Sequence, residues 1–553
     1  MADHTGSAMK DFQTNLASCT ELAACKRPYI RATKWRTWLK SKVSVKVEGK
    51  NYETTQVSRL LDVAYRHLGK PTHPINRDHI CHPQHECLLI FSILLELGQG
   101  SLIHQFLRRD SVDKHLPFKL YELRNLFRDL GVTDPEQAAA NFDKLQWKYC
   151  PAKLDFHGTR QYPENRIMPF CRRKRINLKG GTAQLWKIAV LEEFVEEKLR
   201  KAVEDSRFDD GDGLGPRYEF ALKSFEDGNK QLFLNEKEAF FALNKQSAMV
   251  QFLGAYGHEE AEIPSQNNPT TYANSCEGRV RPTHNIILEF GENDLEEYFA
   301  GTVPPYLQAE LDAFWRGLFV VAEAVKSIHN LTIDTDGRKE EFSGWHADIK
   351  PDNILLVHGK FKLADPGFMK VVRKTGKEPV EALSGGTETF GAPERCPGWT
   401  GTPSRVHQTI DTWSLGCVFS IAATWVVLGY QGIRQYNKIR KMAIKKVAVD
   451  HESAKSLASS RQHQKAFTTH GDHFHDGSEV LSAVLNWHTF LRNAVRKNDA
   501  ITSRVLDLVE QKMLLGDAKS RIKAAQTCDE LERILKEAER ATPIPSTPKW
   551  HTF

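Results

Sequence analysis

The 553-residue sequence has almost no excess of charge of either sign. Its 76 lysines and arginines stand against 70 aspartates and glutamates, which leaves a formal net charge of +6. So small a value in a chain of this length argues against nucleic acid as a partner. The ten cysteines are scattered along the whole chain rather than gathered in a small domain, which argues against a disulfide-stapled secreted protein.

Targeting and membrane-spanning segments are also scarce. The N-terminal stretch MADHTGSAMKDFQTN lacks the basic residues and apolar run of a signal peptide. The best candidate for a membrane span, Ser414 to Tyr430, has only 17 residues, and an apolar helix of this kind is equally what the centre of a large domain contains. We therefore expect no membrane partner and a cytoplasmic or nuclear location.

The residues up to about 160 show the spacing of helices. Apolar stripes at helical spacing cover Thr55–Leu68, Glu86–Leu97 and Phe118–Leu130, and Pro135 follows the third. Residues 1–160 are therefore predicted to be a helical N-terminal region, with no evident chemistry of its own. Whether this region binds a partner stays open.

The pattern changes from about residue 161. Short runs rich in strand formers, at Gln184–Val190, Tyr218–Phe225 and Asn285–Phe290, predict a sheet. Between the first two, the charged stretch Glu192–Gly215 indicates a surface insertion or a long hairpin loop. Helical patterns return after residue 305 and persist to about 540, and the Pro/Thr-rich residues 541–553 are expected to be a flexible tail.

The most informative segments are GWHADIKPDNILLV at residues 344–357 and FKLADPGF at residues 361–368. Transfer of a phosphoryl group needs a carboxylate to orient the hydroxyl, a lysine for the moving phosphate and oxygen ligands for Mg²⁺, all at one point. An Asp followed after four intervening residues by an Asn, with a second Asp twelve residues further on, has that spacing. The candidates are Asp348, Lys350 and Asn353 for catalysis, and Asn353 and Asp365 for the metal.

In these motifs the chain resembles the eukaryotic Ser/Thr protein kinases over roughly residues 160–540. The resemblance implies an α+β, two-lobed fold, with a small antiparallel β lobe near 161–290 and a large helical lobe near 291–540. Insertions are expected near 190–215 and 445–480. It also implies ATP and Mg²⁺, or Mn²⁺, as cofactors and a protein as substrate, and Lys350 is typical of the kinases that act on serine and threonine.

The same resemblance assigns the nucleotide-binding residues. In FALK, Lys223 stands where the family's lysine pairs with the α- and β-phosphates. NEKEAFFAL resembles the helix whose glutamate orients that lysine, with Glu236 as the candidate and Glu238 as the alternative. NIILEFGENDL resembles the hinge, where Glu289, Phe290 and Gly291 would offer backbone groups to adenine.

Other positions match the family's supporting residues. His346 begins the catalytic motif, and Asp411 in DTWSLGC would cap the backbone of the catalytic loop. In SGGTETFGAPE, Thr387 would bond near the catalytic Asp and Glu394 would close the activation segment. Arg521 in GDAKSRIKAA stands where the family pairs an arginine with that glutamate.

More narrowly, the sequence resembles a group of fungal protein kinases that carry a helical N-terminal region and long insertions. The segments that carry this likeness are MPF, GGTAQLWKI, the QW of residues 146–147, FHDG at 474–477 and NWH at 486–488.

The glycine-rich loop departs from the family pattern. GxGxxG glycines let backbone N–H groups approach phosphate oxygens. Aligning Leu185 with the valine after that motif leaves Gly180 at one of the three positions, with Gly181 adjacent. A low nucleotide affinity is therefore expected.

Two further departures concern the metal motif and the catalytic triplet. Pro366 follows Asp365 where the family has phenylalanine, and proline biases the residue before it toward an extended backbone. Ala347 replaces the arginine that pairs with a phosphorylated activation segment, so we hypothesise that phosphorylation there does not switch the protein by the usual charge pairing.

Two rival functions and two rival metal sites stay open. A pseudokinase scaffold would fit the thinned phosphate loop and the DPG motif. A small-molecule phosphotransferase would share HxDxxxxN, although Lys350 and the GT…APE segment argue against it. Zinc at HICHPQHEC, residues 79–87, or a metal at His470, His473 and His475, is the less favoured interpretation of those histidines.

Overall fold

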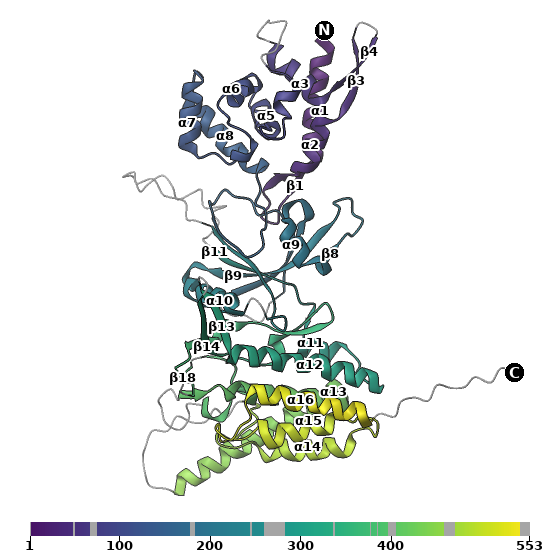
Figure 1. Ribbon diagram of the computed structural model, residues 1–553, viewed down its shortest axis with the longest axis vertical. Coiled ribbons are helices and arrows are strands. Elements are labelled where there is room, and N and C mark those ends of the chain that lie inside the picture. The colour runs from purple at the N-terminus through teal and green to yellow at the C-terminus, as the bar shows by residue number, and fades with distance from the viewer. Residues whose placement is uncertain are drawn as a thin grey trace, which may run out of the picture. The chain divides into compact units, whose positions relative to one another are not determined.

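The structure, a computed structural model, describes residues 2–47, 50–66, 75–176, 183–243, 246–258, 283–335, 338–375, 378–383, 385–395, 405–457 and 471–541. Two compact units divide the chain (Figure 1). The first holds residues 1–228 and 253–287, and the second holds residues 229–252 and 288–553. Helices and strands occur in both, which confirms the predicted mixture.

The first 150 residues are mainly helical, which confirms the predicted N-terminal helical region. Trp35, Phe91 and Phe142 are fully buried in its core. Two strand pairs that the apolar spacing did not indicate, β1 with β2 and β3 with β4, interrupt the helices. The elements are α1 (Ala2–Ser18), β1 (Thr20–Leu22), β2 (Pro28–Ile30), α2 (Ala32–Lys40), β3 (Lys42–Val47), β4 (Lys50–Thr55), α3 (Gln56–Tyr65), α4 (Arg77–Ile80), α5 (Leu88–Glu96), α6 (Ile103–Arg108), α7 (Leu120–Asp129) and α8 (Pro135–Tyr149).

Pro135 follows the third predicted helix, and it also begins α8, which the sequence pattern missed. Proline is tolerated at the first helical position because its missing N–H would have no partner there. The side chain of Asp134 caps the helix by accepting a hydrogen bond of 3.0 Å from the N–H of Gln137.

The sheet of the first unit has the order β5-β10-β11-β9-β7-β6, with β8 paired to β9. The strands β6, β7, β8 and β9 pair antiparallel, but β5 pairs parallel with β10, so the predicted antiparallel sheet is wrong at that edge. The polar sequence of β5, GTRQY, has no apolar alternation from which a strand could be predicted. The elements are β5 (Gly158–Tyr162), β6 (Phe170–Arg175), β7 (Ala183–Leu191), α9 (Glu197–Ala202), β8 (Arg207–Phe208), β9 (Arg217–Glu226), β10 (Phe252–His258) and β11 (Thr283–Leu288).

The second unit begins with a helix and then builds three small sheets and a helical body. Its strands are ordered β12-β15-β16, β13-β14-β17 and β18-β19. The elements before residue 408 are α10 (Lys230–Leu243), β12 (Asn293–Asp294), α11 (Leu295–Gly301), α12 (Gln308–His329), β13 (Leu331–Thr335), β14 (Arg338–Trp345), β15 (Ile354–Val357), β16 (Lys360–Leu363), β17 (Lys370–Arg373), β18 (Val380–Ala382) and β19 (Arg405–His407). Those after it are α13 (Thr409–Leu457), α14 (Ser482–Ala494), α15 (Thr502–Leu508) and α16 (Ala524–Ala541).

The apolar run that resembled a membrane span lies in α13. Among the described residues, the part of α13 from Thr409 to Val449 is long and apolar enough to cross a membrane, but 83% of its most apolar window is buried inside the protein. Trp413 and Trp425 are fully buried there, in the same core as α12. The helix breaks at Gly429, whose φ of 69° lies in the left-handed region that favours glycine.

Within the first unit, the N-terminal region is joined to the sheet by a shared core. Tyr29 is fully buried, and its ring lies 5.4 Å from that of Phe194. The N–H of Ala24 donates to the carbonyl of Phe170 at the start of β6. The helical region therefore packs on the sheet rather than being tethered to it by a linker alone.

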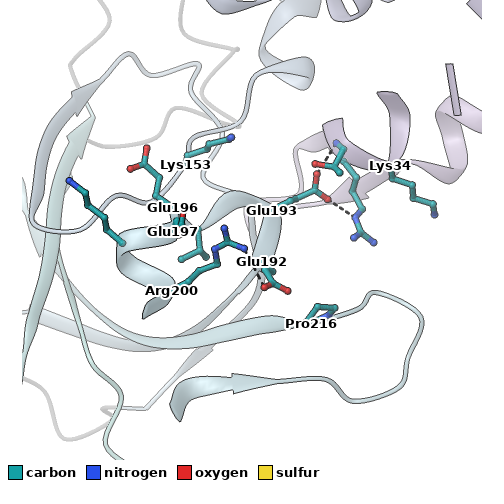
Figure 2. Close-up of a pocket in the computed structure, with 12 residues that line it drawn as sticks. Lys34, Lys153, Glu192, Glu193, Glu196, Glu197, Arg200 and Pro216 are labelled. Atoms are coloured by element: carbon teal, nitrogen blue, oxygen red, sulfur yellow. Dashed lines mark hydrogen bonds and ion pairs between the residues drawn. The ribbon is translucent and has the colours of Figure 1, made fainter. Parts of the chain in front are cut away.

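A charged hollow of about 870 Å³ lies at this junction, and Figure 2 shows glutamates of the segment 192–197 around it together with Lys34. Glu193 accepts hydrogen bonds from Arg31 Nε at 2.9 Å and from the N–H of Thr33 at 3.0 Å. Thr33 is in the first turn of α2, whose own N-cap residue makes no side-chain cap. Glu193 thus caps the N-terminus of α2 although it belongs to another segment. A negative charge at a helix N-terminus also interacts favourably with the helix dipole. None of the residues around the hollow is a predicted site residue.

Replacing Glu193 with alanine is expected to lower the free energy of unfolding by about 1–2 kcal/mol, because a cap and a partly buried ion pair are lost together. Urea unfolding of the full chain, monitored by circular dichroism, measures this. Glu197→Ala is the control, since the Glu197 side chain forms an exposed ion pair with Lys201. Equal stability of the two variants would contradict the assignment.

Candidate active site

One buried carboxylate binds the backbone of the catalytic loop. Asp411, in the first turn of α13, accepts hydrogen bonds from the N–H of His346 at 2.8 Å and of Ala347 at 2.9 Å. The ring of His329, at the end of α12, donates to the same carboxylate at 3.0 Å. Burial alone would raise the pKa of Asp411, but the hydrogen bonds and charge from His329 hold that pKa below its ordinary value.

The backbone of the loop turns at Ala347 in the left-handed region, with φ 65°. Arg395 donates to the carbonyl of Ala347 and to that of Gly385. A Cβ added at Gly386, whose φ is 89°, would lie 2.6 Å from the Ala347 carbonyl oxygen, so only glycine lets the two segments approach this closely. The activation segment is thereby fixed to the catalytic loop without an arginine at position 347.

Four predicted residues form one hydrogen-bonded cluster. Asn353 Nδ2 donates to the carbonyl oxygen of Asp348 at 2.8 Å and to its Oδ2 at 3.0 Å. Lys350 Nζ lies 3.0 Å from Asp348 Oδ2 and donates to Thr387 Oγ1 at 2.7 Å. The N–H of Thr387 donates to Asp348 Oδ1 at 2.8 Å. A buried carboxylate is thus oriented from three sides.

The structure corrects the expected backbone at the metal motif. Asp365 has φ 54° and ψ 67°, in the left-handed region rather than extended. Proline favours an extended backbone for the residue before it, so the left-handed backbone of Asp365 departs from that local preference. A Cβ added at Gly367 would lie 3.1 Å from Asp365 Oδ1 and 3.4 Å from Glu236 Oε2. Glu236 on α10 is buried and borders the metal motif, whereas Glu238 is exposed.

The hinge segment contains a second buried carboxylate, that of Glu289. Glu289 is 9% exposed, and both its carboxylate oxygens accept from Lys362 Nζ, at 2.7 and 2.8 Å. Its Oε1 also accepts from the N–H of Gln251 at 2.6 Å, and its own N–H donates to the Gln251 carbonyl at 3.1 Å. The side chain of Glu289 therefore fixes the hinge to β16.

The next two residues of the hinge differ in their surroundings. Phe290 is half-buried. A Cβ at Gly291 would lie 2.9 Å from Cβ of Leu355 in β15, so the hinge backbone passes directly over that strand. A larger residue at position 291 would push the hinge away from the strand.

The closing motif is fixed by a buried arginine. The side chain of Arg521 is fully buried and donates to both oxygens of Glu394, at 2.8 and 3.1 Å. It also donates to the carbonyls of Thr409 and Leu515. A charge removed from water in this way is stabilised by several charge-assisted bonds.

The first unit holds the remaining nucleotide candidates. Lys223 lies in β9 directly opposite Leu185 in β7, and its Nζ lies 5.6 Å from the ring centroid of Phe225. Gly180 and Gly181 lie outside the described residues.

The metal alternatives find no support among the residues that the structure describes. No group of three or more His, Cys, Asp or Glu side chains there has the geometry to hold a metal ion. His85 instead bonds to Asp110, and His475 is fully buried, which lowers its pKa to about 3. His470 lies outside the described residues.

Comparison with known proteins gives a family match over part of the chain. Residues 284–531 match the protein kinase domain family, so this chain contains a protein kinase domain. The predicted resemblance to protein kinases is thereby confirmed.

Individual relatives are similar only over part of the chain. The serine/threonine-protein kinase MPS1 of Encephalitozoon cuniculi is 30% identical over 135 residues, which are 24% of this chain and 20% of the relative. The dual specificity protein kinase Ttk of Danio rerio is 30% identical over 138 residues, 24% of this chain and 12% of the relative. The fission yeast serine/threonine-protein kinase ppk23 is 30% identical over 159 residues, 28% of this chain and 34% of the relative. The chain thus spans about a third or less of the length of these relatives.

Sequence reasoning missed the residues that contact the activation segment from outside the motifs. Arg395 follows the closing motif by one position, and only the absence of arginine at position 347 hinted that another cation would be needed. Thr389 donates to Asp472 at 2.8 Å across 83 positions of sequence, a contact that no local pattern indicates.

Replacing Arg521 with methionine is expected to lower the free energy of unfolding by about 2–3 kcal/mol, because Glu394 and two carbonyls lose a buried donor. Thermal unfolding of the full chain checks this. Lys519→Met, an exposed change in the same loop, is the matched control. If the two variants unfold together, the buried pair contributes nothing to stability.

Proposed function

We propose that this protein transfers the γ-phosphoryl group of ATP to serine and threonine hydroxyls of protein substrates. The observation that carries the proposal is the cluster of Asp348, Lys350, Asn353 and Thr387, because it joins an oriented carboxylate and a cation at one point. Positioning and charge stabilisation are what phosphoryl transfer asks of a protein.

Each residue of the cluster has a separate task. Asp348 orients the substrate hydroxyl and accepts its proton, since its oxygens are held by Thr387 and Asn353 and cannot rotate away. Lys350 lies beside that carboxylate and stabilises the phosphate being moved. The bond from Lys350 to Thr387 keeps the cation within the site while no phosphate is present.

The donor set fits a magnesium ion. Asn353 uses Nδ2 for both bonds to Asp348, which leaves its Oδ1 to serve as a ligand, and Asp365 supplies a carboxylate. When bound, Mg²⁺, or Mn²⁺ in its place, would neutralise charge on the phosphate oxygens. Lys223 and Glu236 are assigned to the nucleotide phosphates, and Glu289, Phe290 and Gly291 to adenine, on the resemblance to kinases.

The larger architecture belongs to the same proposal. The helical region over residues 1–160 would precede a two-lobed kinase domain over 161–540, although the family match itself begins at residue 284. Protein substrates follow from the kinase assignment. The cytoplasmic or nuclear location, with neither nucleic acid nor membrane as a partner, is carried over from the composition and charge of the sequence.

The decisive measurement is transfer of labelled phosphate from ATP with Mg²⁺ or Mn²⁺ to generic protein substrates. Asp348→Asn is expected to lower kcat about a hundredfold or more, because the amide cannot take the hydroxyl proton. Asp529→Asn, an exposed change on α16, should leave kcat unchanged. Absence of transfer, or transfer indifferent to Asp348→Asn, would sink the proposal and favour a scaffold.

A second measurement separates nucleotide binding from turnover. ATP with Mg²⁺ is expected to raise the melting temperature of the full chain by a few degrees, because a ligand that binds only the folded state stabilises it. Asp365→Asn should lose the part of that shift that depends on Mg²⁺ and keep the melting temperature without nucleotide. A shift that is the same in both proteins would remove Asp365 from the metal site.

A further inference from the structure

The activation segment is contacted by three consecutive residues from far along the chain. Thr389 Oγ1 donates to Asp472 Oδ1 at 2.8 Å. The ring Nδ1–H of His473 donates to the carbonyl of Glu388 at 3.1 Å. The ring of Phe474, which is fully buried, lies 6.1 Å from that of Phe390.

Asp472 is itself held in place by a buried cation. Arg440, in the second half of α13, is 1% exposed and donates Nε to the carbonyl of Asp472 at 3.0 Å. Its Nη2 lies 3.6 Å from Asp472 Oδ2. The guanidinium carbon lies 4.3 Å from the ring centroid of Tyr436 and 4.1 Å from that of Phe474, so two aromatic faces also fix the cation.

The contacted segment is short and is fixed at its other end as well. The N–H of Thr387 donates to Asp348, and the carbonyl of Phe390 accepts from Ser414 Oγ at 2.8 Å. In protein kinases activation loops are commonly ordered by a phosphate that pairs with arginine. Here position 347 is alanine rather than arginine, and the carboxylate of Asp472 faces Thr389.

We propose that Asp472 is a positioning residue that holds the loop Thr387–Phe390 ready for a peptide substrate without any phosphate, and that a negative charge at position 389 releases the loop. This rests on the proposed protein kinase function. Because Asp472 already carries a negative charge and is anchored by Arg440, a second negative charge at position 389 would be repelled from its place.

Kinetics of the full chain test the effect on substrate. Asp472→Ala and Thr389→Val, each of which removes the hydrogen bond between the two side chains, are each expected to raise the peptide KM about tenfold, equal to about 1.4 kcal/mol. The KM for ATP should stay within about twofold, since neither residue belongs to the nucleotide site. Thr389→Ser should behave as the wild type because it keeps the hydroxyl, and the double variant should be no worse than either single one. If the effects of the two single substitutions on the peptide KM were additive in the double variant, the proposal would be overturned.

The matched control is Glu479→Gln, which removes one negative charge from the same segment at an exposed residue that does not contact the loop. It should leave the peptide KM unchanged. Thr389→Glu should raise that KM at least as much as Thr389→Val, and activation by Thr389→Glu would contradict the proposal.

Hydrogen exchange of the full chain without substrate separates this proposal from the proposed function. Amides of residues 387–391 should exchange about tenfold faster in Asp472→Ala than in the wild type, while residues 354–363 stay unchanged. Unchanged exchange at 387–391 would overturn the proposal whatever the activity. Faster exchange in a protein whose wild type transfers no phosphate would support the positioning role and refute the kinase activity.

Discussion

The geometry of the candidate active site depends on the fully buried carboxylate of Asp411. It binds two successive backbone N–H groups, those of His346 and Ala347, immediately before Asp348. A left-handed backbone at a residue other than glycine costs about 1–3 kcal/mol, and the bend at Ala347 is of this kind. The bonds from Asp411 offset that cost, and they do so from the first half of α13, where residues 409–426 are all buried. The catalytic loop is therefore as rigid as the core beneath it.

The departures from the kinase pattern have a common physical consequence. Position 347 carries no arginine, and the side chain of Arg395 instead bonds to this turn through the carbonyl of Ala347. With proline after Asp365, the metal motif adopts a left-handed turn beside the buried Glu236. In both places the backbone keeps a strained conformation because the residues packed around it hold it there. A mobile charged side chain does not relieve that strain.

How far the site could be predicted depends on how local its determinants are. Asp348, Lys350 and Asn353 lie within six residues, so their spacing alone indicates a shared task. Arg521 and Glu394 are far apart, and only the resemblance to a family paired them before the structure did. Thr389 and Asp472 had neither advantage, because their contact arises from packing between segments with no shared pattern. The left-handed turn at Asp365 was missed because a following proline favours an extended backbone, and the folded chain overrides that local preference.

The same argument explains the elements that were missed in the fold. Helices α3 and α7 have apolar residues on a buried face, and α5 is apolar and buried on all sides; the apolar residues of all three predict them. Strand β5 is polar throughout and exists because its backbone pairs with the edge of β10, a property that side-chain patterns do not report. The cap that Glu193 places on α2 is of the same kind, since a backbone N–H group is satisfied by a side chain 160 positions away. Backbone groups must be satisfied somewhere, and where the partner is distant in sequence only the folded chain identifies it.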